Sequence, residues 1–184
     1  AAPRHVGSGY RRTVNVGEMR TGLIRALVQQ RRLTEAEAEA REALNALYLF
    51  GSSSRGYSGK YAGIMAMMAT VFREQGRLDD AEYMARIAVN MHESRCSAPE
   101  ALGLTQARKA LVDILGQREN WKGVLEQVAK ARAGLQDFPK IFAREFGTSL
   151  ARAEAELYAG DAAAGRRLLE SRLAQALKAG GENS

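Results

Sequence analysis

The sequence holds few of the residues on which most catalytic centres, disulfides and metal sites depend. It contains one cysteine, two histidines and three prolines in 184 residues. A single cysteine excludes an internal disulfide framework, and neither an H-E-x-x-H motif nor paired cysteines at zinc-site spacing occur. No apolar run approaches the roughly 18 residues that a membrane span requires. We therefore expect no membrane span, no metal and no cofactor.

Runs of alternating valine or isoleucine, the usual signal of β-strands, are also missing, whereas alanine and leucine are abundant. Both of these residues are strong helix formers, so the composition predicts an all-α protein. A chain of 184 residues suffices for one ordinary domain or for a short solenoid.

Positive charge is concentrated at the start of the sequence. Residues 1–32 hold seven arginines and one acid, Glu18, whereas basic and acidic side chains balance over the remainder. Such an arm can meet an acidic partner, nucleic acid or anionic lipid. The arginines are sparse, however, and Tyr10 is the one aromatic among them. We therefore favour a flexible basic leader over residues 1–12, followed by an arginine-rich helix face, and disfavour nucleic-acid binding.

The stretch from Gly76 to Ala81 separates two helical patterns. Glycine can end the first helix because it takes positive φ without steric cost. Asp79 and Asp80 then lie in the first turn of the next helix, where the positive end of the helix dipole favours acids. Apolar residues recur at helical spacing on both sides: Met65, Met68, Ala69 and Phe72 before the stretch, and Ala81, Ala85, Ala88 and Val89 after it.

This region resembles the tetratricopeptide repeat (TPR), whose first helix carries a large, a small and an aromatic residue and is followed by a turn glycine and a second helix with small residues. Those roles fall to Met68, Ala69, Phe72, Gly76, Leu78, Ala81, Ala85 and Ala88. Met65 stands where tryptophan is common in the family, and Ala85 stands where an aromatic is usual. The resemblance implies a right-handed α-solenoid of antiparallel helix pairs.

Three further segments repeat parts of this pattern. The equivalent positions are Ala36, Ala81, Val124 and Gly165. Their spacings of 45, 43 and 41 residues exceed the TPR period of about 34 and match other helix-pair repeats of about 40–47 residues. Longer TPR forms, such as those of kinesin light chains, are similar in period. We predict four helix pairs in a single domain over 13–184, at about 13–50, 57–94, 97–136 and 137–179, with turns near 33, 76, 119 and 160.

Capping residues set the expected helix starts. Thr34 and Glu37 have the S/T-x-x-E spacing of a capping box, and the same spacing recurs from Ser97 to Glu100. Asn120 is expected to cap the helix that follows it.

Apolar side chains at helical spacing form the expected buried stripes. The first helix carries Leu23, Ile24, Leu27 and Val28. In the fourth pair, one helix carries Phe142, Phe146, Leu150, Ala153 and Leu157, and its partner carries Leu168, Leu169, Leu173 and Leu177. Four methionines, Met65, Met67, Met68 and Met84, are expected to fill the core rather than to bind a soft metal.

Two segments that could suggest chemistry are interpreted as structural. Residues 51–59 are rich in glycine and serine and predict a loop, but they lack the G-x-x-x-x-G-K-[ST] pattern of a phosphate-binding loop. His92 and Cys96 could form a nucleophilic pair. A histidine at a helix end followed by a loop cysteine is the favoured interpretation.

Since no reactive site is predicted, the candidate functional feature is a binding surface. In stacked helix pairs the first helix of each pair lines the concave side, and the resemblance places these residues there: Arg25, Gln29, Thr70, Arg73, Lys109, Asp113 and Gln117. Some members of the family bind chaperone C-terminal carboxylates with a Lys/Asn/Arg set. That set is missing, since Asp113 stands where asparagine is needed, and we do not predict chaperone-tail binding.

We therefore expect a non-catalytic scaffold that binds a protein or peptide, an acidic one included, on its concave face. One alternative is a regulatory or assembly segment that packs against a neighbouring domain or against its own copies. Nucleic-acid binding through residues 4–32 is less favoured, and an enzyme least. The sequence does not determine the oligomeric state. It leaves two compartments open: cytoplasmic, or extracytoplasmic if a cleaved signal peptide precedes residue 1.

Overall fold

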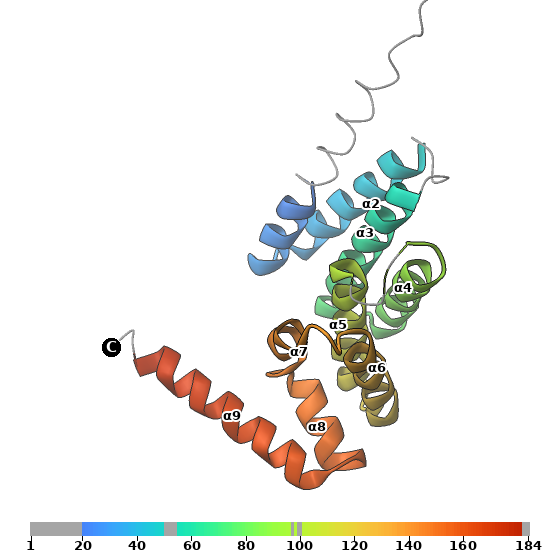
Figure 1. The fold of residues 1–184 in the computed structure, drawn as a ribbon. Coiled ribbons are helices and arrows are strands. Elements are labelled where there is room, and N and C mark those ends of the chain that lie inside the picture. Colours follow the sequence, from blue (N-terminus) through green and yellow to red (C-terminus); the bar gives the residue numbers. More distant parts are fainter. Residues whose placement is uncertain (1–19, 50–54, 97, 99–100, 182–184) are drawn as a thin grey trace, which may run out of the picture. The chain divides into compact units, whose positions relative to one another are not determined.

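The computed structural model describes residues 20–49, 55–96, 98 and 101–181, and all regular structure among them is helical (Figure 1). The all-α prediction is therefore confirmed for these residues. The leader predicted at residues 1–12 lies outside them. The chain divides into two compact units, residues 1–97 and 98–184, and each is described by itself. The single domain predicted over residues 13–184 stays a prediction.

Unit 1 contains a helix over residues 20–29, α2 (Leu33–Leu49), α3 (Arg55–Glu74) and α4 (Leu78–Met91). A short π-helical segment, η1 (His92–Cys96), continues α4. The long helix α3 packs against α2, α4 and η1, and it is the centre of the unit. Its buried side chains form most of the apolar core: Ile64, Met65, Met68, Val71 and Phe72.

Small residues allow the helices of unit 1 to approach closely. Ala36, Ala40 and Ala43 on α2 are fully buried, as are Ala81, Ala85 and Ala88 on α4. Burial of both series agrees with the equivalence of Ala36 and Ala81 that the repeat interpretation uses. The core role is also confirmed for Met65 and Met68, whereas Met67 and Met84 are only partly buried. The prediction was wrong at Leu23, which is 45% exposed beside the buried Ile24.

Unit 2 contains α5 (Leu102–Gln117), α6 (Trp121–Gly134), α7 (Pro139–Phe146), α8 (Leu150–Ala159) and α9 (Ala162–Gly181). The helix α8 packs against α5, α6 and α9, while α7 makes smaller contacts with α5 and α6. The core is built from fully buried side chains: Leu104, Leu111, Ile114, Leu115, Leu135 and Phe146.

Three of the turns share one backbone conformation. Arg31, Gly76 and Glu119 have φ values of 61°, 79° and 56°. At each, the residue's N–H bonds the carbonyl three residues earlier, and the next N–H bonds the carbonyl five residues before it. This pair of bonds is the Schellman motif that ends a helix. The three positions are 45 and 43 residues apart, the spacings that the sequence predicts for successive pairs.

The fourth predicted pair is wrong in detail, because three helices occupy its place. The single helix expected to carry Phe142 through Leu157 is broken at residues 147–149 into α7 and α8. Ser149 is the N-cap of α8, and its Oγ accepts a hydrogen bond from the Arg152 N–H at 3.4 Å. A side chain with good capping chemistry thus starts a new helix, although the apolar spacing continues across the break.

Two other predicted starts are also wrong. The helix α2 begins at Leu33, so Thr34 lies inside it and does not cap it; the Glu37 carboxylate bonds Gln75 and Arg77 instead. The helix α3 begins at Arg55, so residues 55–59 are helical and not loop; packing of its apolar face outweighs the cost of about 1 kcal/mol that a glycine carries in a helix.

The remaining predictions about boundaries have mixed outcomes. Ser97 lies outside the described residues, and α5 begins only at Leu102. The cap at Asn120 is confirmed, since its side-chain Oδ1 accepts a hydrogen bond from the Gly123 N–H at 3.1 Å.

The C-terminal helix α9 has twice as many residues as α8, and its second half extends beyond α8 (Figure 1). Gly165 permits the close contact between the two helices, because a Cβ there would lie 2.6 Å from the Leu157 nitrogen. Farther along, Leu173 and Leu177 are 60% and 68% exposed. The buried stripe predicted for α9 therefore ends where α8 ends, and those two leucines face solvent in unit 2.

Candidate functional site

The positions predicted to bind a partner fall in both units. In unit 1, Arg25 and Gln29 are exposed on the helix 20–29. Thr70 is partly buried in α3, and its hydroxyl donates to the Ala66 carbonyl at 3.2 Å, so that hydroxyl is already satisfied within the helix. Arg73, near the end of α3, contacts the neighbouring Glu74 carboxylate at 2.6 Å.

In unit 2 the three predicted positions lie along α5. Lys109 donates to the Asp113 carboxylate at 2.6 Å, and Gln117 is exposed at the helix end. Lys109 and Asp113 are four residues apart, so the ion pair could have been read from the sequence. Two of the three proposed cations, Arg73 and Lys109, therefore already have a carboxylate partner, and a ligand carboxylate has to compete with it.

A polar network ties α2 to the α3–α4 turn in unit 1. The Glu37 carboxylate accepts hydrogen bonds from Gln75 Nε2 at 3.0 Å and Arg41 Nη2 at 2.7 Å, and it also pairs with Arg77. Burial raises the pKa of Glu37, but hydrogen bonds from these three side chains lower it, and the net pKa lies below its ordinary value. The Arg77 guanidinium also lies 4.0 Å from the centre of the Phe72 ring. We interpret this network as structural.

Unit 2 contains an open hollow of about 470 Å³ along one face of α6. Six of its lining residues follow α6 and the residues just after it, and the seventh is on α8: Leu125, Val128, Ala129, Arg132, Ala133, Gln136 and Glu156. We call this hollow the α6 groove. Its floor is apolar, and the charged groups on its wall are one guanidinium and one carboxylate. Its volume lies within the usual range of ligand sites, about 300–1,000 Å³.

Two arginines from different helices meet at one aromatic ring beside this groove. The guanidinium carbons of Arg132 on α6 and Arg152 on α8 lie 5.2 and 5.3 Å from the centre of the Phe142 ring on α7. We call these residues the arginine pair. Arg152 Nη1 donates to the Phe146 carbonyl at 3.2 Å, whereas its Nε is buried without a hydrogen-bond partner in the described chain.

The environment of Arg152 disfavours its positive charge. Burial lowers the pKa of Arg152, and the nearby charge of Arg132 lowers it further, while Glu156 acts in the opposite direction. Within the described residues, neither guanidinium forms an ion pair with a carboxylate. The sequence analysis gave neither arginine a role, because they lie 20 residues apart and no local pattern indicates that they meet.

The remaining reactive groups do not converge in the part of the chain that the structure describes. His92 is buried, and burial lowers its pKa; the Cys96 side chain lies outside the described part, so the His92–Cys96 pair stays untested. No cluster of three or more His, Cys, Asp or Glu side chains could hold a metal ion among the described residues. None of the described helices is both long enough and apolar enough to span a membrane.

Comparison with known proteins gives a likeness to solved structures. No protein-family model matches the chain, and no curated protein matches it. Among solved structures, the chain is similar to BtubC (BKLC) from P. vanneervenii, with a TM-score of 0.65 and 18% sequence identity over 90% of this chain. The likeness is one of fold. The match spans 65% of the length of that chain.

Proposed function

We propose that the protein is a non-catalytic scaffold that binds a protein or peptide partner, and that its helix pairs stack into a right-handed, TPR-like solenoid. The observation that carries this proposal is the recurrence of one helix hairpin. The same Schellman turn occurs at Arg31, Gly76 and Glu119, and Ala36, Ala81 and Val124 are fully buried at equivalent places. Repeated rigid hairpins present their exposed faces as an extended surface, which is how helical repeat proteins bind partners.

The proposed contacts are on the first helix of each pair. Arg25 and Gln29 supply exposed polar groups, and Arg73 and Lys109 supply cations whose charge is partly compensated by Glu74 and Asp113. An exposed ion pair contributes only about 0–1 kcal/mol. We therefore assign most of the affinity to apolar contacts, and we assign to these charges the orientation and association rate of an acidic partner.

The experiment that tests this proposal is partner capture by photo-crosslinking, followed by affinity measurement with the captured partner. The test variant replaces Arg25, Arg73 and Lys109 with Ala, and a second variant deletes residues 1–12. A matched control replaces Arg41, Arg86 and Lys130 with Ala; these cations lie on the second helices and each pairs with a carboxylate four residues away. We expect the first variant to slow association and the control to leave it unchanged.

Loss of binding on deletion of residues 1–12, with normal binding by the triple variant, would place the contact in the leader and overturn the first-helix proposal. Equal slowing by the test and control variants would show that the effect is one of net charge and does not depend on these positions.

A second candidate function is assembly, with a neighbouring domain or with a second copy of this chain. The exposed leucines on α9, Leu173 and Leu177, favour it, because large apolar side chains at successive helical turns are typical of a helix that packs against another helix. Nucleic-acid binding through residues 4–32 has less support, since the arginines there are sparse and Tyr10 is the one aromatic among them.

A further inference from the structure

We propose that the arginine pair and the α6 groove form a site in unit 2 that binds a peptide segment through a carboxylate and an adjacent small apolar side chain. This inference rests on the proposed function, since it names the chemistry of a peptide partner. It also assigns contacts that the family resemblance does not, because Arg132 is on α6 and Arg152 is on α8, away from the seven first-helix positions.

The first argument is charge. Most of the ion-paired cations described above have a carboxylate partner within unit 1 or on their own helix. Arg132 and Arg152 instead approach a common ring, and no carboxylate of the described residues lies within ion-pair distance of either. Arg152 is partly buried and Arg132 is exposed beside it. Two like charges this near one ring repel, and an anion placed beside them lowers this cost. A ligand carboxylate therefore binds more favourably at this site than at Lys109, because Asp113 already pairs with the Lys109 ammonium group.

The second argument is preorganisation of the donors. Arg152 is held by the Phe142 ring and by the Phe146 carbonyl, which engages Nη1. Its Nη2 makes no hydrogen bond within the described chain, so one amino group of a fixed guanidinium is left for a ligand. A guanidinium held in place loses little side-chain entropy when it binds, and its planar fork matches the geometry of a carboxylate.

The third argument is that the arginine pair adjoins the α6 groove. Arg132 belongs both to the pair and to the wall of the α6 groove, so a carboxylate at the pair brings the adjacent part of its ligand onto the apolar floor. Leu125, Ala129 and Ala133 make that floor suitable for a small apolar side chain.

The carboxylate of Glu156, the lining residue that comes from α8, decides between ligand classes. A polyanion such as nucleic acid would place a second negative charge near Glu156 and be repelled. A peptide offers neutral amide N–H groups, which can donate to this carboxylate. The combination of two cations, one anion and an apolar floor therefore favours a peptide with a single acidic group.

The inference can be tested with the full chain and two fluorescein-labelled hexapeptide libraries. Each peptide of the first library has one valine and one glutamate at varied spacing in an alanine background, and the second library has glutamine in place of glutamate. We expect fluorescence anisotropy at low salt to show at least about tenfold tighter binding of the best glutamate peptide than of its glutamine match, a difference typical of charge-assisted hydrogen bonds.

The variants Arg132→Gln and Arg152→Gln are expected to abolish the preference for glutamate. Lys130→Gln, an exposed α6 cation paired with Glu126, is the matched control and should retain it. Arg132 is exposed, so its variant should fold; for the partly buried Arg152, the variant Arg152→Lys keeps the charge, and circular dichroism checks both. Inorganic phosphate at millimolar concentration should not displace the peptide.

Equal binding of the two libraries would overturn the inference while leaving peptide binding, and thus the proposed function, intact. Absence of binding by both libraries would also overturn it, and the proposed function would then be decided by the crosslinking experiment alone. Full displacement by phosphate would show a site for free anions, which contradicts recognition of a peptide.

Discussion

Arg31 and Gly76 have the same left-handed backbone and the same two hydrogen bonds at the ends of two successive first helices, although only one of them is glycine. The Arg31 side chain pairs with Glu74, which lies two residues before Gly76 in the following hairpin. The ion pair therefore links two turns that the repeat makes equivalent, and it accompanies a backbone conformation that arginine rarely adopts.

The strained turns predict opposite effects of two substitutions. Gly76→Ala places a Cβ at a φ of 79° and should destabilise the protein by about 1–2 kcal/mol. Glu119→Gly relieves the same strain at a φ of 56° and should stabilise it by a comparable or smaller amount. Glu119 is preferable to Arg31 for this test because it forms no ion pair in the described chain. Thermal unfolding measures both, and a stabilised Gly76→Ala would contradict the turn geometry.

The close packing of α3 and α4 predicts that Ala81 tolerates no larger side chain. Ala81 is fully buried, and Ala81→Leu should overpack the contact at a cost of about 1–3 kcal/mol. Ala38→Leu is the matched control, since Ala38 is exposed on α2 and should change stability little. Urea unfolding provides the comparison, and an unchanged midpoint for Ala81→Leu would show that this position is not packed as described.

The contact of α8 with α9 predicts that Gly165 cannot be replaced by alanine without a backbone shift. A Cβ at Gly165 would lie 2.6 Å from the Leu157 nitrogen and 2.8 Å from the Ala153 carbonyl oxygen, so Gly165→Ala should destabilise unit 2 by about 1–3 kcal/mol. At Gly22 a Cβ meets nothing within 4 Å, and Gly22→Ala should stabilise its helix by about 0.5–1 kcal/mol. Differential scanning calorimetry should give shifts of opposite sign.

The buried His92 predicts a pH dependence of stability. Burial lowers its pKa in the folded protein below the ordinary value of 6.5, so at acidic pH the unfolded chain binds a proton that the folded chain does not. The contribution of neutral His92 is full above about pH 6.5 and is lost as pH falls below it towards the folded-state pKa. Urea midpoints at pH 7.5 and 5.5 should fall more for the wild type than for His92→Gln. A parallel fall in both proteins would assign the effect to other groups.

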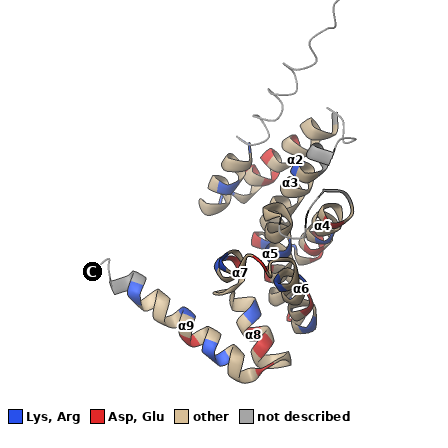
Figure 2. Ribbon diagram, viewed as in Figure 1, with Lys and Arg blue, Asp and Glu red and all other residues tan. Residues whose placement is uncertain are grey.

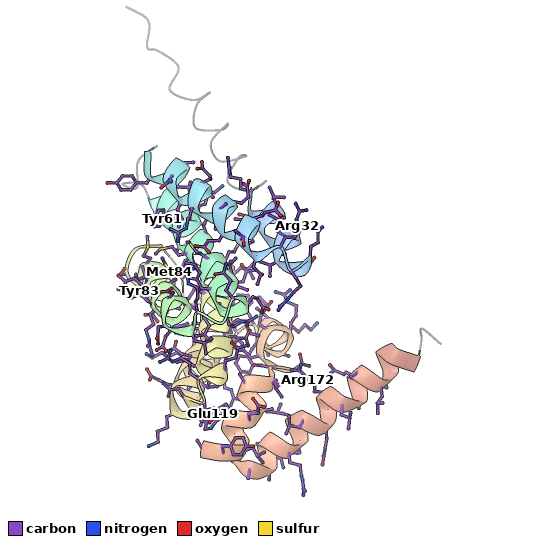
Figure 3. All side chains as sticks on the ribbon, turned by 180° about the vertical axis from the view of Figure 1, so that it is seen from behind. Arg32, Tyr61, Tyr83, Met84, Glu119 and Arg172 are labelled. Atoms are coloured by element: carbon purple, nitrogen blue, oxygen red, sulfur yellow. The ribbon has the colours of Figure 1, made fainter. Side chains whose placement is uncertain are left out.

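Because Leu173 and Leu177 are exposed on α9, we predict that replacing them affects assembly and leaves the stability of the fold nearly unchanged. Leu173→Gln with Leu177→Gln should change the free energy of unfolding by less than about 0.5 kcal/mol per site, because both side chains face solvent in unit 2. Arg172, labelled in Figure 3, should be kept, because it donates to the Thr148 carbonyl at 2.8 Å. If α9 joins two copies of the chain, sedimentation should show dissociation in the double variant. A monomeric wild type would leave a different protein as the partner of this helix.

The charge on α9 predicts salt dependence for that assembly. Arg166, Arg167, Arg172 and Lys178 lie on α9, and Glu170 is its one acid among the described residues (Figure 2). If a different protein covers the leucines, its surface is expected to be acidic, so association should weaken between 50 and roughly 200 mM salt, where screening shortens to about 10 Å and below. Association that strengthens with salt would instead indicate contacts that are mainly apolar.

The sequence by itself determined the helical class, the four turns and the alignment of the first three hairpins. These features depend on neighbours in the sequence. A Schellman turn is closed by bonds over three and five residues, and small side chains at spacings of four and three, as in Ala81, Ala85 and Ala88, mark one helix face whatever packs against it. The same reasoning could have paired Lys109 with Asp113.

Only the tertiary structure decided the break at residues 147–149, the exposure of Leu173 and Leu177, and the meeting of Arg132 with Arg152. The apolar spacing continues through Ser149 and hides the break. The capping side chain of Ser149 permits a helix to start there, and the packing of α8 on α5 and α6 decides that it does. The two leucines continue an apolar stripe, yet α8 is too short to cover them. The arginines lie on separate helices that α7 brings to one ring. Contacts between distant segments depend on where whole helices pack, which no local pattern in the sequence specifies.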